Sequence, residues 1–175
     1  MTLVEFIKAE LTRLHAMLDV ATRDLTPEQW HAVPGGAANH LAFELWHFYR
    51  TEDNIVRFIL QNRRPTVWME GGWAERLGLP AVAQGTGMTT EDAHALRIND
   101  FATFRGYVDA VRASTDEYLS NPDESTFGQP VMVKPLGEMP AIRALGQVVM
   151  THGFTHLGEV ELVRTLLVLK PAIGV

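Results

Sequence analysis

Two histidines near the C-terminal end of the chain have a spacing that suits metal binding. His152 and His156 are four residues apart, so in a helix they lie one turn apart on the same face. Cβ atoms about 5–6 Å apart leave room for two imidazole nitrogens to bind one ion at about 2.0–2.1 Å. The same spacing also occurs in the polar stripe of a solvated surface helix, so the pattern alone is weak.

The residues around this pair are apolar, which favours a buried site. Leu145 and Val149 precede the histidines, and Val163 follows them on the same side of a helical wheel. Polar side chains within such an inward-facing stripe need a partner to offset their burial, and a metal ion is the simplest one. Glu159, three residues after His156, could orient a ligand ring or add a carboxylate oxygen.

A third ligand is available from an earlier apolar segment, which holds His40 and His47. Two helical turns span about 10.5 Å, so these two histidines cannot both bind one ion while the helix stays intact. We select His47 because it lies within the segment between two aromatic residues. His40 stands at the start of the segment beside a glycine-rich loop, where solvent exposure or helix capping is expected. Glu44 lies one turn before His47 and could support a ligand by hydrogen bonding or act as a fourth ligand.

The elements that must carry these residues are helical. Apolar residues recur at helical spacing in four long segments, which we expect at residues 3–22, 39–61, 89–121 and 140–170. Thr2 and Glu5 have the spacing of a capping box, and Pro140 can open the last helix. We therefore predict an all-α fold, a four-helix bundle with long crossover loops.

Two glycine- and proline-rich connections separate these helices. Residues 62–88 should form an irregular crossover, and a connection of this length is more often functional than idle. Within it, Trp68 and Trp73 could wall a pocket for a cofactor or substrate, or could seal the core or a subunit interface. Residues 121–139 have one strand-like piece, at 131–133, and could hold a small hairpin. The bundle could run up-down-up-down, or the first crossover could join parallel neighbours.

Composition limits the class of protein. The 175 residues are 46% hydrophobic and 21% charged, which is ordinary globular composition, and we expect a single domain over residues 1–175. A net charge of −6 leaves no broad basic surface, so we expect no nucleic-acid partner. Charges interrupt the first twenty residues, and no stretch reaches the roughly 18 apolar residues of a membrane helix. We expect a soluble cytoplasmic protein with no membrane partner.

The chain has no cysteine, so it has neither a thiolate metal site nor a thiol nucleophile of its own. Any metal must be held by histidine, aspartate or glutamate. The remaining histidines, His15, His31 and His94, have no partners at a suitable spacing and are expected at the surface.

Residues on two of the expected helices resemble the DinB-like superfamily, also called DinB/YfiT-like; they are Asn39, Ala42, Trp46, His47, Arg50, Glu52, Asp53, His152, His156, Gly158 and Glu159. The resemblance covers most of the chain, including the tryptophan-containing crossover. It implies a four-helix bundle, commonly a homodimer, in which three histidines bind a divalent metal, often zinc or nickel. Carried over by position, these ligands would be His47, His152 and His156.

Three histidine ligands with an open coordination position are typical of a catalytic rather than a structural site. Such an ion lowers the pKa of a bound water toward about 7 and deprotonates a bound thiol. The resemblance adds that some branches are transferases or isomerases that use low-molecular-weight thiols, which would here arrive as a cosubstrate. Glu44 and Glu159 are the candidate catalytic bases. We expect a metal-dependent transferase of this type, or a hydrolase, acting on a small molecule; the alternative is a non-catalytic metal-binding or stress-response bundle.

Overall fold

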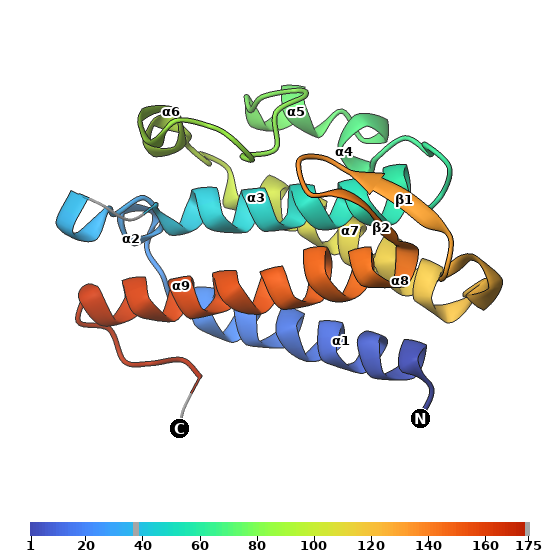
Figure 1. Cartoon of the computed structure of the whole chain (residues 1–175). Helices are drawn as coiled ribbons and strands as arrows, with labels where there is room; N and C mark the ends of the chain where they lie inside the picture. Colours follow the sequence, from blue (N-terminus) through green and yellow to red (C-terminus); the bar gives the residue numbers. More distant parts are fainter. Residues whose placement is uncertain (37–38, 174–175) are drawn as a thin grey trace.

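The computed structural model describes residues 1–36 and 39–173, and its main feature is a bundle of four long helices (Figure 1). The fourth helix is continuous through α8 (Ala141–Arg143), η4 (Ala144–Thr151) and α9 (His152–Leu166), and both η4 and η2 (Asn54–Ile59) are π-helical. The four helices are α1 (Leu3–Thr22), α3 with η2 (Leu41–Asp53, Asn54–Ile59), α7 (Phe101–Ser120) and α8 with η4 and α9 (Ala141–Arg143, Ala144–Thr151, His152–Leu166). The prediction of an all-α four-helix bundle with long crossovers is confirmed.

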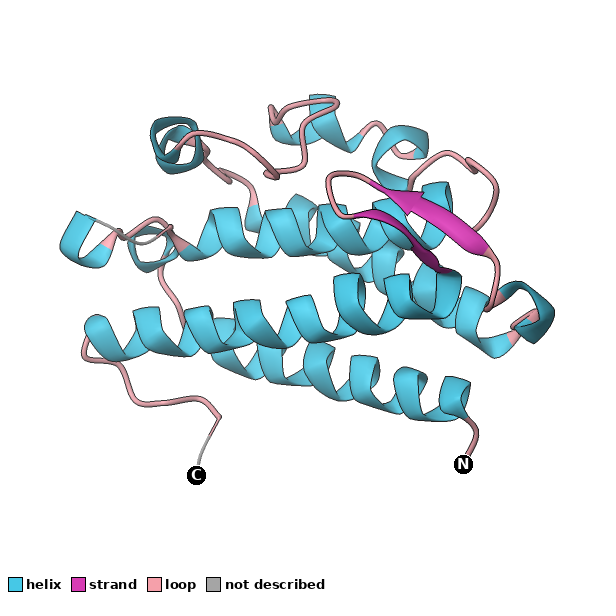
Figure 2. Ribbon diagram, in the orientation of Figure 1, coloured by secondary structure: helices cyan, strands magenta, loops and turns pink. Residues whose placement is uncertain are grey.

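Shorter elements occupy the connections, as the colouring by secondary structure in Figure 2 shows. They are α2 (Pro27–Trp30), η1 (Pro34–Gly36), α4 (Val67–Glu70), α5 (Trp73–Leu77), α6 (Thr90–Ala95), η3 (Glu124–Thr126), β1 (Pro130–Val133) and β2 (Gly137–Pro140). The two strands form an antiparallel hairpin in which Val133 pairs with Gly137. The hairpin expected between the third and fourth helices is therefore present.

Helix α1 has the bounds and the cap that its sequence predicts. The Thr2 side chain accepts a hydrogen bond from the Glu5 backbone nitrogen, and the Glu5 carboxylate accepts one from the Thr2 nitrogen, which completes the capping box. One face of the helix is buried in the core through Ile7, Leu11, Leu14 and Leu18. The helix thus supplies an apolar wall for the bundle.

Helices α3 and α7 are neighbours and run in the same direction (Figure 1). The Tyr107 hydroxyl donates to the Tyr49 carbonyl at 3.3 Å, and the Thr115 hydroxyl donates to Glu52 at 2.7 Å. A later residue of α7 thus contacts a later residue of α3, as expected for parallel helices. The chain must therefore return across the bundle between α3 and α7. Of the two topologies compatible with the sequence, the structure has the one in which the first crossover joins parallel helices.

The third helix differs from its prediction. We expected one helix over residues 89–121, but α6 ends at Ala95 and α7 begins at Phe101. The Asp100 carboxylate accepts a hydrogen bond from the Thr103 nitrogen at 2.9 Å, so a second N-cap starts a new helix there. The break lets α6 belong to the crossover and α7 to the bundle.

The crossover is attached to α3 by a buried carboxylate. Asp53 accepts hydrogen bonds from the backbone nitrogens of Val67 and Trp68 at 2.8 and 2.9 Å. Burial raises the pKa of Asp53, although these two hydrogen bonds act in the opposite direction. The residues after Thr66 are therefore more regular than the irregular loop that we expected, and they form α4 and α5.

The expectation that His15 lies at the surface is wrong. His15 is buried, and its Nε2 lies 2.9 Å from the fully buried carboxylate of Glu52. Nearby, Arg112 pairs with Asp19 at 2.9 Å, so a polar layer crosses the core between α1, α3 and α7. His31, which was also expected at the surface, is half-buried, and its Nε2 accepts a hydrogen bond from the Ile98 nitrogen.

Among the described residues, no helix is long and apolar enough to span a membrane.

Candidate metal centre

His47, His152 and His156 converge at the interface between α3 and α9. Each of the three rings offers one nitrogen as a ligand atom, and these three nitrogens lie within 4.8 Å of one another. The rings of His152 and His156 each have their centroid 5.2 Å from that of His47, and all three rings are nearly perpendicular to one another. Helical spacing brings the last two together, and packing of α3 against α9 adds the first. The structure thus brings together the three ligands selected from the sequence.

His47 is fixed by the crossover loop that passes over it. Its Nδ1 lies 2.5 Å from the backbone carbonyl oxygen of Gln84 and donates to it, which leaves Nε2 unprotonated for an ion. The loop can approach this closely because Gly85, at a φ of +98°, has no side chain: a Cβ there would lie 2.6 Å from Nδ1 of His47. Burial lowers the pKa of His47, which favours the neutral form that a metal ligand needs.

His156 is fixed by two carboxylates on the side away from its neighbours. Its Nδ1 lies 2.6 Å from Glu44 and 2.6 Å from Glu159. Burial lowers the pKa of His156, but hydrogen bonds and charge attraction from Glu159 and Glu44 outweigh it and raise the pKa to about 9. The same contact lowers the pKa of Glu159. The two glutamates selected from the sequence therefore lie behind one ligand, where they orient its ring.

His152 completes the group with its Nε2 directed at that of His156, 2.9 Å away. Burial and the neighbouring imidazoles lower the pKa of His152 to about 4, so the ring is neutral. Its Nδ1 is buried and has no hydrogen-bond partner among the described residues. The lone pair on Nε2 of this neutral ring accepts a hydrogen bond from His156 when that ring is doubly protonated, and the same lone pair can bind an ion once His156 has lost its proton.

These donors fit a divalent transition metal. Three imidazoles suit zinc, nickel, copper and iron, and the orientation of His47 and His156 by oxygen acceptors on Nδ1 is the usual support for ligation through Nε2. Glu44, His156 and Glu159 also form a group close enough to hold an ion. In that group His156 would need Nδ1, which both carboxylates already contact, so the three-histidine arrangement is the more complete site.

His40 lies outside this group. Its Nδ1 accepts a hydrogen bond from the Phe43 nitrogen at 3.0 Å, and it thereby caps α3. The capping role expected from the sequence is present, but the side chain is buried rather than solvated, and its ring packs 5.3 Å from that of His31. Burial lowers the pKa of His40 to about 4.

Two cavities adjoin the histidines and share His47 and Thr86 in their walls. We call them the hairpin-side cavity, which is lined by residues of the β1–β2 hairpin, and the carboxylate-side cavity, which is lined by Glu44 and Glu159. The hairpin-side cavity has a volume of about 340 Å³ and is lined by His47, Thr51, Asn54, Ile55, Gln84, Thr86, Val133, Lys134, Pro135, Leu136, Gln147, Val148 and His152. The carboxylate-side cavity has a volume of about 320 Å³ and is lined by Asn39, Phe43, Glu44, His47, the 85–90 loop, Ala93, His156 and Glu159.

Trp68 and Trp73 line neither cavity. Both are buried, and their rings lie 4.8 and 5.8 Å from that of Tyr107 on α7. Of the two alternatives that the sequence left open, the structure has the packed core between crossover and bundle. The tryptophans hold the crossover in place, and the residues that approach the histidines come from further along it, at 84–90.

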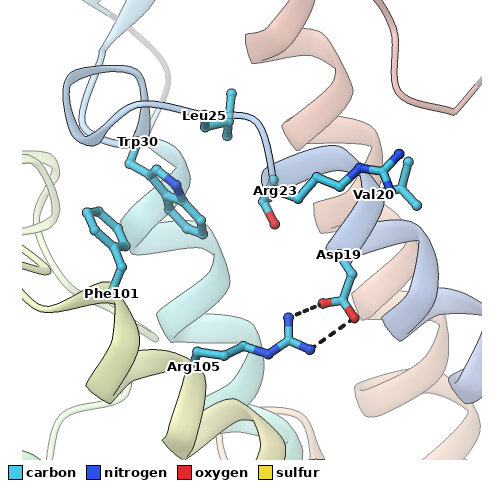
Figure 3. A pocket seen from close by; sticks show the side chains of 8 residues that line it. Asp19, Val20, Arg23, Leu25, Trp30, Phe101 and Arg105 are labelled. Atoms are coloured by element: carbon cyan, nitrogen blue, oxygen red, sulfur yellow. Dashed lines mark hydrogen bonds and ion pairs between the residues drawn. The ribbon is translucent and has the colours of Figure 1, made fainter.

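A further cavity lies away from the histidines, at the end of the bundle where α1 finishes (Figure 3). Trp30 and Phe101 form one side, and the ion pair between Asp19 and Arg105 forms another. It has a volume of about 430 Å³ and contains none of the residues that could hold the ion. Size alone therefore does not identify the functional site.

Two parts of the site were not found from the sequence. The contact of His47 with Gln84 uses a backbone carbonyl, so the residue type at position 84 does not indicate it. Gly85 was compatible with a close approach of the loop backbone to another residue. Lys134 and its hairpin neighbours reach the hairpin-side cavity only through the return of the chain before α9. Neither contact follows from periodicity, because both join segments that are distant in sequence.

Comparison with known proteins supports the fold. A search of curated proteins finds no match. The structure of a conserved protein from Enterococcus faecalis has the same fold, with a TM-score of 0.83 over 96% of this chain and 98% of that one, at 18% identity. Residues 10–160, which include all three histidines, match the DinB superfamily. The chain therefore belongs to the DinB superfamily.

Proposed function

We propose that this protein is a metal-dependent enzyme that acts on a small molecule, most specifically a transferase that uses a low-molecular-weight thiol. The observation that carries the proposal is the geometry of His47, His152 and His156, which each offer a ring nitrogen within 4.8 Å of the others, beside two cavities. Zinc or nickel is the proposed ion. A bound ion would supply Lewis acidity that makes a thiol or a water nucleophilic at neutral pH.

The protein's own groups would position and support this chemistry. Gln84 and the carboxylates of Glu44 and Glu159 hold two of the ligand rings in place from behind. Glu44 and Glu159 also line the carboxylate-side cavity, so either could accept a proton from a bound thiol or water. Glu159 is the more accessible of the two, with a side chain that is 47% exposed against 6% for Glu44.

Two cavities on two sides of the histidines favour transfer over hydrolysis. Transfer needs places for a donor and an acceptor, whereas hydrolysis needs a place for one substrate beside water. The residues that separate the cavities, His47 and Thr86, are common to both walls, so two small molecules could approach the same ion. Hydrolysis remains the second candidate activity, since three histidine ligands leave a coordination position for water.

Metal content tests the ligand set. Each of His47→Ala, His152→Ala and His156→Ala should lower the metal content of protein purified without an affinity tag to a small fraction of the wild-type value. His40→Ala is the matched control, because it removes a buried histidine of the same helix that lies outside the group. Retention of metal by the His47 variant together with loss in the His40 variant would show that the wrong histidine was selected.

A cobalt-substituted sample tests the open position. Addition of 2-mercaptoethanol should produce thiolate-to-cobalt absorption bands, and azide should change the spectrum without them. Bands with the thiol support the transferase, and a response to anions alone supports the hydrolase. If neither ligand changes the spectrum at millimolar concentration, the site is closed, and the non-catalytic metal-binding bundle becomes the better description.

We further propose that the protein acts in the cytoplasm as a homodimer. Support for an interface comes from Leu162 and Leu166, which lie one turn apart on α9 and are 55% and 51% exposed. Light scattering after size-exclusion chromatography should give a mass close to twice 19.5 kDa. Replacing both leucines with glutamine should then give the monomer mass.

A further inference from the structure

The hairpin-side cavity continues into a longer groove. A neighbouring cavity of about 630 Å³ shares Asn54, Gln84, Val133 and Lys134 with it, so the two form one passage. We call this passage the hairpin groove. It runs between the hairpin and the π-helical end of α3, which lie against each other (Figure 1), and it ends at His47 and His152.

The charged groups of the hairpin groove are all cationic. Lys134 and Arg63 line it, both are exposed, and neither has a hydrogen bond or ion pair from its side chain to any described residue. Within the described part of the chain, no aspartate or glutamate lines the groove, although the protein carries a net charge of −6. Glu138 is the acidic residue of the hairpin, and it does not line the groove. These two cations are therefore available to a ligand.

The remaining walls of the hairpin groove combine apolar side chains with the neutral polar residues Asn54, Asn62 and Gln84. Ile55 and Val148 line its inner part, next to the histidines. Leu136, Met132 and Phe58 line its outer part and are 54%, 54% and 37% exposed. Exposed apolar side chains beside unpaired cations suit a ligand with a hydrocarbon part and a negative charge.

The carboxylate-side cavity has the opposite charge. Glu44 and Glu159 line it, and none of the described lysines or arginines does. The two approaches to the histidines therefore differ in electrostatic sign, and an anion is favoured on the hairpin side and disfavoured on the other.

We propose that the hairpin groove binds an organic anion with a short apolar chain, and that this anion is one of the two small molecules brought to the metal centre. Lys134 and Arg63 select the negative charge, and the apolar walls hold the chain. This inference rests on the proposed function for the identity of the site, and it adds the class of molecule that enters from this side.

The test compares two thiols of equal length, 6-mercaptohexanoate and 6-mercaptohexanol, on cobalt-substituted protein. The thiolate-to-cobalt bands give a dissociation constant for each, and the carboxylate compound should bind more tightly. Lys134→Gln and Arg63→Gln should each reduce that preference about fivefold. This is the change in dissociation constant that corresponds to the attraction of one charge pair about 4 Å apart in water. The preference should also shrink in 1 M NaCl.

Lys170→Gln is the matched control, because it removes one positive charge at an exposed lysine that lines none of the cavities. It should leave the preference unchanged. A second measurement needs no metal: NMR line broadening of hexanoate, but not of hexanol, should be seen with wild-type protein and lost in the Lys134→Gln/Arg63→Gln double variant.

The outcomes separate the inference from the proposed function. If both thiols give bands with equal affinity and hexanoate is not broadened, the groove does not select anions, while the thiol-binding metal centre stands. If no thiol gives bands but hexanoate is broadened in a Lys134-dependent manner, the groove is an anion site and the proposed function fails. If the variants change the oligomeric mass instead of the preference, the groove is an interface between copies and the inference is wrong.

Discussion

The ring nitrogens of the three histidines are divided between two tasks. In His47 and His156, Nδ1 is held by protein oxygens, so that Nε2 is directed at the centre of the group. The holding groups differ: a neutral carbonyl supports His47, and two carboxylates support His156. Negative charge behind a ligand increases its basicity, so His156 should be the strongest donor and also the one that competes most with protons.

This difference predicts proton release when metal binds. In the metal-free protein, burial lowers the pKa of His156, but Glu159 and Glu44 raise it to about 9, so the ring carries two protons at pH 7.5. His152, with a pKa lowered to about 4, has none to lose. Zinc binding at pH 7.5 should therefore release about one proton, and this number should fall toward zero as pH rises past 9.

Calorimetry in two buffers of different ionisation enthalpy measures that proton release. Glu159→Gln is the informative variant, because it removes one of the contacts that raise the pKa of His156. It should decrease the number of protons released at pH 7.5. An equal heat of binding in both buffers for the wild-type protein would contradict the prediction.

A second prediction concerns Gly85, which lies against His47. In Gly85→Ala the new Cβ would be 2.6 Å from Nδ1 of His47, so the loop must move away and the Gln84 hydrogen bond is lost. We expect at least a tenfold loss of metal affinity, in keeping with the usual effect of removing support from a ligand ring. Metal affinity is measured by competition with a chromogenic chelator.

Gly87→Ala is the control for backbone strain. Gly87 also has a positive φ, of +77°, but a Cβ there would have no atom within 4 Å. Both substitutions should lower thermal stability through the strained backbone. Only the change at position 85 should weaken metal binding, and equal weakening by both would mean that contact with His47 is unimportant.

The three converging histidines could be predicted from the sequence, whereas their surroundings could not. His152 and His156 are fixed relative to each other by one helical turn, and His47 was the one well-placed histidine within the expected second helix. Gln84 acts through its backbone and Lys134 through a hairpin, so neither has a residue type or spacing that marks it. Long-range packing decides these contacts.

At the scale of the element, α9 depends on a glycine for its approach to the core. A Cβ at Gly153 would lie 2.4 Å from Leu14 and 2.6 Å from Phe48. The absence of a side chain therefore allows α9 to pack closely against α1 and α3, next to His152. Close packing at this point places His152 and His156 beside His47.

Two glycines of α9 give a matched prediction. Gly153→Ala should lower the free energy of unfolding by about 1–3 kcal/mol through overpacking and should also reduce metal affinity. Gly158→Ala should raise it by up to about 1 kcal/mol, because that position is exposed, has open space and lies inside a helix. Urea denaturation of the metal-free variants measures both, and a loss of stability at position 158 would contradict the packing argument.

Local signals located some helices well and others poorly. The bounds of α1 agree with the predicted residues 3–22, because a capping box and an unbroken apolar stripe define it. The apolar pattern over residues 89–121 predicts one helix, because it includes the first cap and misses the second, at Asp100. An aspartate followed three residues later by threonine was a usable signal there.

At the scale of the whole molecule, a polar layer crosses the bundle beside the apolar core. Glu52 is fully buried; its carboxylate accepts from Thr115 at 2.7 Å and contacts His15 at 2.9 Å. Burial raises the pKa of Glu52, but His15, Thr115 and Arg112 together lower it below its usual 4.5. Its ionised form is therefore favoured by the folded state.

This carboxylate predicts a loss of stability in acid. Because the pKa of Glu52 is lower when folded, its contribution is fully present above about pH 4.5 and is lost as pH falls through the folded value. Glu52→Gln should lower the free energy of unfolding at pH 7 by about 1.5–3 kcal/mol, the usual size for hydrogen bonds to a charged group. Urea denaturation between pH 7 and pH 3 should show a smaller decline for the variant, and parallel profiles would contradict this role.

The order of helices in space was the least predictable feature. Both topologies were compatible with the sequence, since a long connection can reach either end of the bundle. Asp53, Trp68 and Tyr107 decide it, because they pack the crossover along α3 and α7 and bring the chain back to where α3 began. This packing depends on three separate segments, which local patterns do not connect.

The hydrogen bond from His47 to Gln84 has a kinetic consequence. The loop holds the imidazole of His47, so in the proposed metal centre opening of the loop and release of the ion would be coupled steps. Metal exchange would then be limited by a backbone fluctuation rather than by the strength of the metal–nitrogen bonds. Amide hydrogen exchange at residues 84–87 and the off-rate of the ion should therefore respond together to temperature, and the lifetime of the loaded protein in the cell would be set by this loop.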